Sequence, residues 1–434
     1  MIDIHNNKPV NPNDLSYDQM LENLQGNILK GHGRNFTSHL LIRFYKNNRI
    51  SALEWIRNFS ERVTSCKEQI KETAMYKKHG ISGNIFMGFY ITGEGYSFIN
   101  KEDPEKLYIK TMKTADLGDP PVEKWEEGYS EEIHAMILIA DDNQEILERE
   151  TLVIKNEIVK FSDIVKIEKG NVIRNDEGEG IEHFGYADGI SQPLFFKVEM
   201  DEYDNKYENI RNFNPSFPLA QVLVPDFFVD NDNAFGSYFV FRKLEQDVKG
   251  FKKQERNIAE KMNLEDDEIV GAAIVGRFED GTPHALSEKD GIIDHLTNNF
   301  NYVQNKPGQC PFLNHIRAVN ERDKESRSMI MARRGIPYGI PSEEGEHTYY
   351  KEKKGLLFMS FQSSIEKQFE AAQRRANEKS DPIIGQKVPY TAQASCFGKD
   401  SETGEVQLQN FVTVKGGEYF FAPSLYYLKN IKIN

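Results

Sequence analysis

An aspartate lies in the middle of a largely apolar loop. The stretch "HFGYADGISQP", residues 183–193, carries Asp188 between an alanine and a glycine. Asp-Gly is a common turn dipeptide, so this residue taken alone is more typical of a chain reversal than of chemistry. Its neighbours Phe184, Tyr186 and Ile190 are apolar, however, and an unpaired carboxylate among apolar groups is costly. The stretch therefore predicts that Asp188 has a partner or a chemical role.

A histidine and two adjacent arginines are the other candidates for chemistry. His315 in "CPFLNHIRAVNER" stands where a helix can begin, and Arg333 and Arg334 in "MARRGIPYG" stand where regular structure stops. A single histidine is more often structural than a ligand, and paired arginines are usually solvated or salt-bridged. In combination, a carboxylate, an imidazole and a guanidinium can move protons, bind a metal ion and stabilise negative charge.

Composition limits the classes of function. The chain has 434 residues, of which 38% are hydrophobic and 28% are charged, as expected for a globular protein of two domains. Its net charge of −14 argues against nucleic acid and against an anionic membrane surface as partners. The three cysteines are too few for a disulfide framework. There is no CxxC or CxxCH sequence, which argues against a zinc ribbon and against covalent haem attachment.

The start of the sequence and its apolar runs indicate where the protein is located. The polar start "MIDIHNNKPVNPND" has no apolar core of a secretion signal and no twin arginine, and apolar runs such as "IVGAAIVG" are too short to span a bilayer. These features predict a cytoplasmic protein with no membrane partner. They do not predict the oligomeric state.

The elements that must position these residues follow a repeated pattern. In the first half, residues 38–45 and 134–140 read as buried strands, and residues 50–78 and 143–161 as the helices that follow them. In the second half, residues 237–244 and 355–361 read as strands. The stretches 245–262 and 364–379 read as the helices that follow those strands.

This alternation predicts an α+β fold made of two ferredoxin-like domains packed together, as in the dimeric α/β barrel type. Any α+β protein shows some alternation, so an internal duplication is one of two open interpretations. The halves are expected to meet in the polar, proline-containing segment 201–218. We expect domains at 1–210, with the Asp188 loop, and at 211–434, with His315 and Arg333.

Several motifs in order resemble the dye-decolorising peroxidases. They are "LQGNILKGHGR", "GYADG" with "ISQP", "VGRFEDGTP", "HIR", "RRGIPYG", "GLLFMSFQ" and "GGEYFFAPSLYYL", and they run from about Leu24 to Leu428. The blocks look most like the longer subgroup of that family, with fungal and bacterial members. The resemblance implies a haem peroxidase that reduces hydrogen peroxide and oxidises aromatic donors such as dyes and phenols. It also implies one non-covalent haem b per chain.

The resemblance also implies site residues. His315 matches the proximal ligand of the haem iron, Asp188 the distal acid and Arg333 the distal arginine, the last because two residues separate it from "IPYG". Leu356 and Phe358 match the apolar wall of the distal pocket.

Further positions match residues that touch the porphyrin. Gly189 and Ile190 would lie against its face, where the glycine lets the backbone come close. Arg277 in "VGR" and Arg322 in "NER" match partners of the propionates. The sequence departs here from the family's usual "NPR", because Glu321 replaces the proline.

The implied chemistry explains the residue types. A carboxylate on the second ring nitrogen makes a ligating imidazole more electron-rich, and we expect Asp381 in "NEKSDPIIG" for this role, with Glu378 as the second choice. On the distal side, Asp188 would take a proton from one peroxide oxygen and give it to the other. Arg333 would stabilise the negative charge on the leaving oxygen.

Two other interpretations remain open. The chain could be a haem carrier or iron-release protein with incidental peroxidase activity, although storage alone would need only the ligand and not Asp188 and Arg333. Alternatively, Cys310 could bind iron as a thiolate, although it lies five residues before His315, which is the better candidate. Bulky donors would be oxidised through surface tyrosine or tryptophan, and the sequence does not single out any relay among the 19 Tyr, Trp55 and Trp125.

Overall fold

The computed structural model describes residues 2–101, 109–291, 297–302, 314–340, 353–385, 390–393 and 405–433. Cys310, considered above as an iron ligand, lies outside these residues. No helix in the described ranges has the length and the apolar composition that crossing a membrane requires.

The N-terminal half is a ferredoxin-like unit. Its four strands are β1 (Phe36–Phe44), β2 (Phe86–Ile91), β3 (Ala135–Asp141) and β4 (Ser162–Asn171). Helix α2 (Arg49–Phe59) follows β1, and helix α5 (Gln144–Ile158) follows β3. The strands are antiparallel in the order β2-β3-β1-β4, which is the order of a split βαβ fold.

The C-terminal half repeats this arrangement. Its main strands are β8 (Phe235–Gln246), β10 (Ile336–Tyr338), β11 (Gly355–Gln362) and β14 (Val412–Ala422), and their order is β10-β11-β8-β14. Helix α7 (Val248–Met262) follows β8, and helix α11 (Ala371–Glu378) follows β11. The predicted pair of ferredoxin-like units is therefore confirmed.

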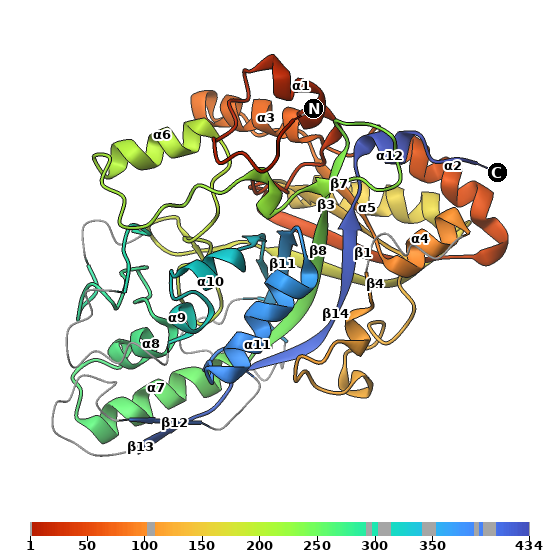
Figure 1. Cartoon of the computed structure of the whole chain (residues 1–434). Helices are drawn as coiled ribbons and strands as arrows, with labels where there is room; N and C mark the ends of the chain where they lie inside the picture. The colour runs from red at the N-terminus through yellow and green to blue at the C-terminus, as the bar shows by residue number, and fades with distance from the viewer. Residues whose placement is uncertain are drawn as a thin grey trace.

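A single sheet joins the two halves, because Phe421 of β14 pairs with Ile91 of β2 (Figure 1). The end strands β10 and β4 come close, and the side chain of Ile336 lies against Gly170. No strand pairing joins these two ends within the described residues, so the sheet curls without closing into a barrel.

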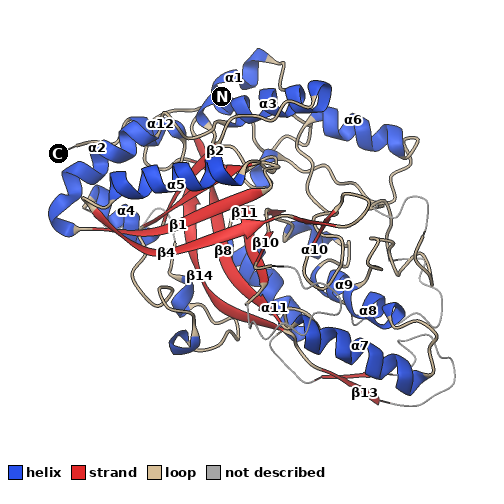
Figure 2. Cartoon of the chain, turned by 180° about the vertical axis from the view of Figure 1, so that it is seen from behind, coloured by secondary structure: helices blue, strands red, loops and turns tan. Residues whose placement is uncertain are grey.

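The described residues also form other helices and strands. They are α1 (Asp18–Asn23), α3 (Cys66–His79), α4 (Gly93–Asn100), α6 (Lys197–Lys206), α8 (Glu268–Val275), α9 (His315–Val319), α10 (Lys324–Ser328), α12 (Leu425–Lys429), β5 (Ile173–Arg174), β6 (Gly180–Ile181), β7 (Val224–Pro225), β9 (Ala332–Arg333), β12 (Tyr390–Gln393) and β13 (Glu405–Leu408). Seen from either side, helices α2, α4, α5 and α12 gather at one end of the sheet, and α7, α8, α9 and α11 at the other (Figures 1 and 2).

The strands predicted from apolar runs are all present, but the helix predicted at 50–78 is wrong in one respect. It is two helices, α2 and α3, separated by residues 60–65. Thr64 accepts a backbone hydrogen bond from Gly26 and donates one to Met87, so this segment pairs with its neighbours instead of with itself. Ser65 then caps α3 by accepting the N–H of Glu68 at 3.1 Å. The predicted linker 201–218 begins inside α6.

Candidate active site

His315 and Asp381 form a hydrogen-bonded pair. His315 opens α9, whose N-terminus is capped by Asn314. Its Nδ1 lies 2.8 Å from Oδ2 of Asp381, which follows α11 and is 1% exposed. A carboxylate accepts a hydrogen bond, so in the neutral imidazole Nδ1 carries the hydrogen and Nε2 keeps its lone pair. The pair leaves Nε2 available for a metal ion.

The aspartate is itself fixed by backbone donors. Its Oδ1 accepts the N–H groups of Ile383 at 2.7 Å and Ile384 at 3.0 Å. Glu378, the second choice for this position, is exposed at the end of α11. The structure thus brings Asp381, and not Glu378, to the imidazole.

Arg277 and Arg322 form a buried cationic cluster beside α9. Arg277 follows α8 and donates through Nη1 to the carbonyl oxygens of Gly281 at 2.7 Å and Thr297 at 3.0 Å. Both guanidinium groups face the ring of Phe300, with Cζ 5.7 Å from its centroid for Arg277 and 3.7 Å for Arg322. Burial, together with the charge of Arg322, lowers the pKa of Arg277 to about 10.

Some N–H donors of this arginine cluster are not used. Nη2 of Arg277 and Nε of Arg322 are buried and have no hydrogen-bond partner among the described residues. Unpaired buried donors are costly, and two adjacent cations favour an anionic group between or beside them. The cluster therefore fits the carboxylate groups of a haem, and the free Nε2 of His315 fits its iron.

The departure from the "NPR" pattern has a structural counterpart. Arg322 has a left-handed backbone with φ 62°, and its N–H donates to Oδ1 of Asn320 at 3.0 Å. Glu321, in place of the proline, forms an ion pair with Arg375 at 2.7 Å. Nη1 of Arg322 still reaches the carbonyl oxygens of Asn298 and Phe300 at 2.7 Å each.

The Asp188 loop borders a cavity. Asp188, Gly189 and Ile190 line a hollow of about 350 Å³ together with residues of the β5–β6 hairpin. Asp188 is exposed there, its N–H donates to the carbonyl of Gly180 at 3.1 Å, and its Oδ1 accepts the N–H of Gly189 at 2.6 Å. Gly189 has φ 77°, a conformation that glycine adopts without strain.

The aromatic neighbours of this loop belong to the core. Phe184 stacks on Phe251 of α7 with centroids 4.3 Å apart, and Tyr186 meets the same ring edge-on. The apolar residues that flank Asp188 thus anchor the loop to the C-terminal half, which leaves the carboxylate at the surface of the cavity.

Arg333 reaches the same loop, whereas Arg334 does not. Arg333 donates through its N–H to Oε1 of Gln192 at 3.1 Å and through Nη2 to the carbonyl of Ser191 at 3.0 Å. Arg334 turns the other way, to the carbonyl oxygens of Asn27 at 2.7 Å and Ile28 at 2.9 Å. The geometry favours Arg333 as the arginine of the site.

No hydrogen bond between Asp188 and Arg333 occurs in the described part of the chain; Arg333 instead contacts the loop at the carbonyl oxygen of Ser191 and at the side chain of Gln192. Ser191 and Gln192 were not predicted as partners of Arg333. The one signal for them was their place in the "ISQP" block.

The predicted apolar wall lies beside Arg333. Leu356 and Phe358 share one face of β11 and are half-buried, while Leu357 is fully buried on the other face. Arg333 on β9 pairs with Ser360, which has the same parity as Leu356 and Phe358, so its side chain projects on their face of the sheet.

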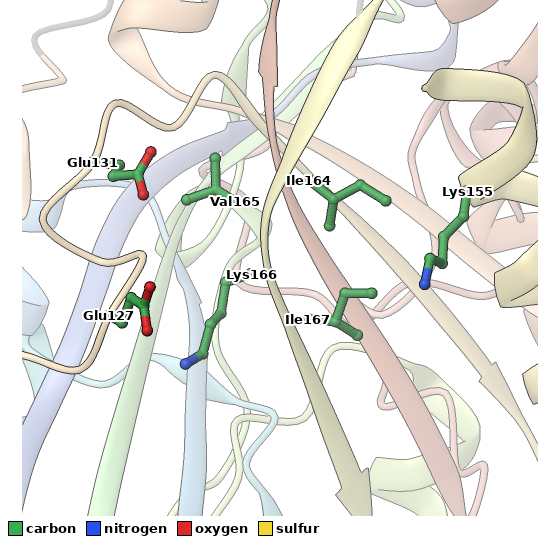
Figure 3. A pocket seen from close by; sticks show the side chains of 7 residues that line it. All are labelled: Glu127, Glu131, Lys155, Ile164, Val165, Lys166 and Ile167. Atoms are coloured by element: carbon green, nitrogen blue, oxygen red, sulfur yellow. The ribbon is translucent and has the colours of Figure 1, made fainter. Parts of the chain in front are cut away.

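A second hollow, of about 440 Å³, lies on the outer strand β4 (Figure 3). The residues that line it are Glu127, Glu131, Lys155, Ile164, Val165, Lys166 and Ile167. None of these residues belongs to the candidate site, and the hollow carries no part of the functional argument.

Comparison with known proteins identifies the family of the chain. Residues 214–384 match the family model for the Dyp-type peroxidase C-terminal region. The multifunctional dye peroxidase DyP2 of Amycolatopsis sp. is 35% identical, over 95% of this chain and 96% of that protein. The dye-decolorizing peroxidase of the fungus Exidia glandulosa is 28% identical, over 68% of this chain and 64% of that protein.

Solved structures show the same likeness. The DyP-type peroxidase of Anabaena sp. superposes with a TM-score of 0.90 at 37% identity, and covers 98% of this chain and 97% of its own. A dye-decolorizing peroxidase in complex with 2,6-dimethoxyphenol has a TM-score of 0.78 at 24% identity, over 95% of this chain and 99% of its own, and this likeness concerns the fold. With its twin ferredoxin-like units, its His–Asp pair and relatives that match it from end to end, the chain belongs to the DyP-type peroxidases.

Proposed function

We propose that the chain holds one non-covalent haem b, with His315 as the iron ligand, and reduces hydrogen peroxide while it oxidises aromatic donors such as dyes and phenols. The observation that carries this proposal is the 2.8 Å contact between Nδ1 of His315 and Asp381, which leaves Nε2 free. The unpaired donors of Arg277 and Arg322 supply the place for the propionates.

Each residue of the site has a separate task. When bound, haem supplies the iron at which the O–O bond of peroxide is cleaved. Asp188 would take a proton from one oxygen of hydrogen peroxide and return it to the other oxygen, which would leave as water. Arg333 stabilises the negative charge on that leaving oxygen. Leu356 and Phe358 would form an apolar wall beside Arg333, which would strengthen its interaction with that charge.

The proposed site takes residues from both halves of the chain. The proposed domain 1–210 contributes Asp188, and the proposed domain 211–434 contributes His315, Asp381 and Arg333. The division of the chain into these two domains is part of the proposal. Dyes and phenols are proposed as donors because the related proteins are named as dye peroxidases and one was solved with a phenol. The cytoplasmic location stays a prediction.

Haem reconstitution tests the proposal. The purified chain titrated with haemin is expected to show the Soret band of ferric, histidine-ligated haem and, with peroxide, to bleach an aromatic dye. His315→Ala should lose the band, and added imidazole should restore it. His134→Ala is the control, because His134 lies outside the site and contacts Phe44 and Glu132 instead. A chain that takes up no haemin contradicts the proposal, and one that binds haemin without peroxidase turnover would be a carrier.

A further inference from the structure

One carboxylate lies inside the turn that carries Asp188. Glu182 accepts the N–H of Phe184 on Oε2 at 2.9 Å and the N–H of Tyr186 on Oε1 at 3.1 Å. Its Oε2 also accepts a hydrogen bond from Nε2 of Gln246 on β8. Each carboxylate oxygen is thus in use, and the side chain links the loop to the central sheet.

The backbone of the turn closes around the same residue. The N–H of Glu182 donates to the carbonyl of Tyr186 at 3.1 Å, and the N–H of Gly185 donates to the carbonyl of Glu182 at 2.9 Å. Gly185 has φ 104°, so the turn is tight, and Asp188 leaves it only two residues after Tyr186. A shift at Tyr186 therefore moves Asp188.

The outer side of the loop is held by other groups. The N–H of Ala187 donates to the carbonyl of Glu279 at 3.3 Å, and the hydroxyl of Tyr186 donates to Glu255 at 2.8 Å. Lys252 forms ion pairs with both of these glutamates. The charged groups on the outer side of the loop therefore form ion pairs with one another.

The charged groups near the inner carboxylate differ from those outside. Asp188 faces Glu182 with a like charge, and Gln246 contributes only an amide. The ring of the adjacent His183 is turned away, to the carbonyl of Tyr338 at 2.7 Å. No cation neutralises Glu182 among the described residues, so the hydrogen bonds from Phe184, Tyr186 and Gln246 are what stabilise its charge.

We propose that Glu182 is a positioning residue for the peroxidase reaction: its ionised carboxylate, bound to two loop amides and to Gln246, holds Asp188 in place at the cavity. This inference rests on the proposed role of Asp188. Burial and the charge of Asp188 raise the pKa of Glu182 to about 7, so the carboxylate is ionised at pH 8 and protonated at pH 5. A protonated carboxyl loses acceptor capacity and holds the loop less firmly.

Glu182→Gln tests the inference, because glutamine keeps the shape of the protonated acid. At pH 8, amide hydrogen exchange at Phe184 and Tyr186 should become faster by on the order of 10-fold, in the holoenzyme and in the haem-free protein alike. The matched control is Glu418→Gln. Glu418 is 1% exposed and accepts the N–H groups of Met112 at 2.8 Å and Tyr419 at 3.0 Å, outside the Asp188 loop. Exchange at positions 184 and 186 should not change in this control.

The rate of reaction with peroxide gives the second measurement. The ratio of wild-type to Glu182→Gln rate constants should be large at pH 8 and approach one at pH 5, where wild-type Glu182 is itself protonated. A ratio that is constant across pH would mean a merely structural role and would overturn the inference. Equal exchange in Glu182→Gln and wild type would overturn it as well.

A second variant covers the case in which Glu182→Gln does not fold. Gln246→Met removes one donor and keeps the carboxylate, and it should speed exchange at Phe184 several-fold, whereas wild-type exchange in this variant contradicts the inference. Failure of the proposed function is recognised separately. A chain without haem uptake would refute the peroxidase role, while the exchange measurements on the haem-free protein would still report on Glu182.

Discussion

Asp381 and His315 stand 66 positions apart in the chain, and yet their side chains meet at 2.8 Å. The contact depends on two loops, because His315 opens α9 and Asp381 follows α11. It orients the imidazole, fixes its tautomer and makes Nε2 a stronger donor to a metal ion. The strength of this donor sets how readily a bound haem iron is oxidised.

Asp381→Asn is therefore expected to keep the haem but to weaken the reaction. A neutral amide polarises the Nδ1–H bond less than a carboxylate does, so the iron reduction potential should rise and the peroxide reaction should slow by about 10–100-fold. Spectroelectrochemistry and stopped-flow mixing measure these effects. Asp226→Asn is the control, since Asp226 is a buried carboxylate that binds Ser424 outside the site. An unchanged potential in Asp381→Asn would contradict the assigned role.

The two adjacent arginines should differ in their effects. Arg333→Leu removes one side-chain hydrogen bond, to Ser191, and should leave stability within about 1 kcal/mol while slowing the peroxide reaction by about 10²–10³-fold. Arg334→Leu leaves the carbonyl oxygens of Asn27 and Ile28 without their donor and should cost about 2–5 kcal/mol of unfolding free energy. Denaturant unfolding and stopped-flow kinetics separate the two effects. The reverse pattern would assign the distal role to Arg334.

Replacement of the distal acid should remove the proton transfer. Asp188→Asn is expected to slow the peroxide reaction by about 10²–10⁴-fold. A carboxylate is still a base in weakly acid solution, where an imidazole is already protonated, so Glu182→Gln, in which residue 182 does not titrate, should keep its rate of reaction with peroxide down to about pH 5. Asp176→Asn, in the turn of the neighbouring β5–β6 hairpin, is the control and should behave as wild type. A Glu182→Gln rate that is lost between pH 8 and pH 5 would argue against a carboxylate as the proton carrier.

The strands that could be predicted from the sequence share one property, which is burial on both faces. Strands β1, β3 and β8 and much of β11 read as apolar runs because they lie inside the sheet under helices. Strand β4, "SDIVKIEKGN", lies at the end of the sheet, and charged residues alternate along it. Strand β10 has three residues and contains a proline. Neither carries the signal of a buried strand, so neither was predicted.

The site shows a similar division. Residue type and motif spacing pointed to His315, Asp188 and Arg333, because the chemistry requires those types. Spacing could not show that Arg334 binds the N-terminal segment, since that contact joins positions about 306 residues apart. The hydrogen bonds of Glu182 could not be predicted from spacing either, because they depend on the positive φ of Gly185 and on the side-chain amide of Gln246 from β8.

A buried histidine outside the site should control stability at acid pH. His39 on β1 is 0% exposed, packs 5.4 Å from the ring of Phe241, and has no hydrogen-bond partner for either ring nitrogen among the described residues. Burial lowers the pKa of His39 to about 4, while the unfolded chain takes up its proton near pH 6.5. The unfolded state therefore binds more protons between these values, and stability is lost as pH falls from 6.5 toward 4.

The loss due to this one group should amount to about 2–3 kcal/mol between pH 7 and pH 4.5. In His39→Leu the difference in unfolding free energy between these pH values should shrink by that amount, because no imidazole remains to be protonated on unfolding. His5→Leu, at an exposed position, should keep the wild-type pH dependence. Urea unfolding at the two pH values decides the matter, and an equal pH dependence in His39→Leu and wild type would show that other groups cause the acid instability.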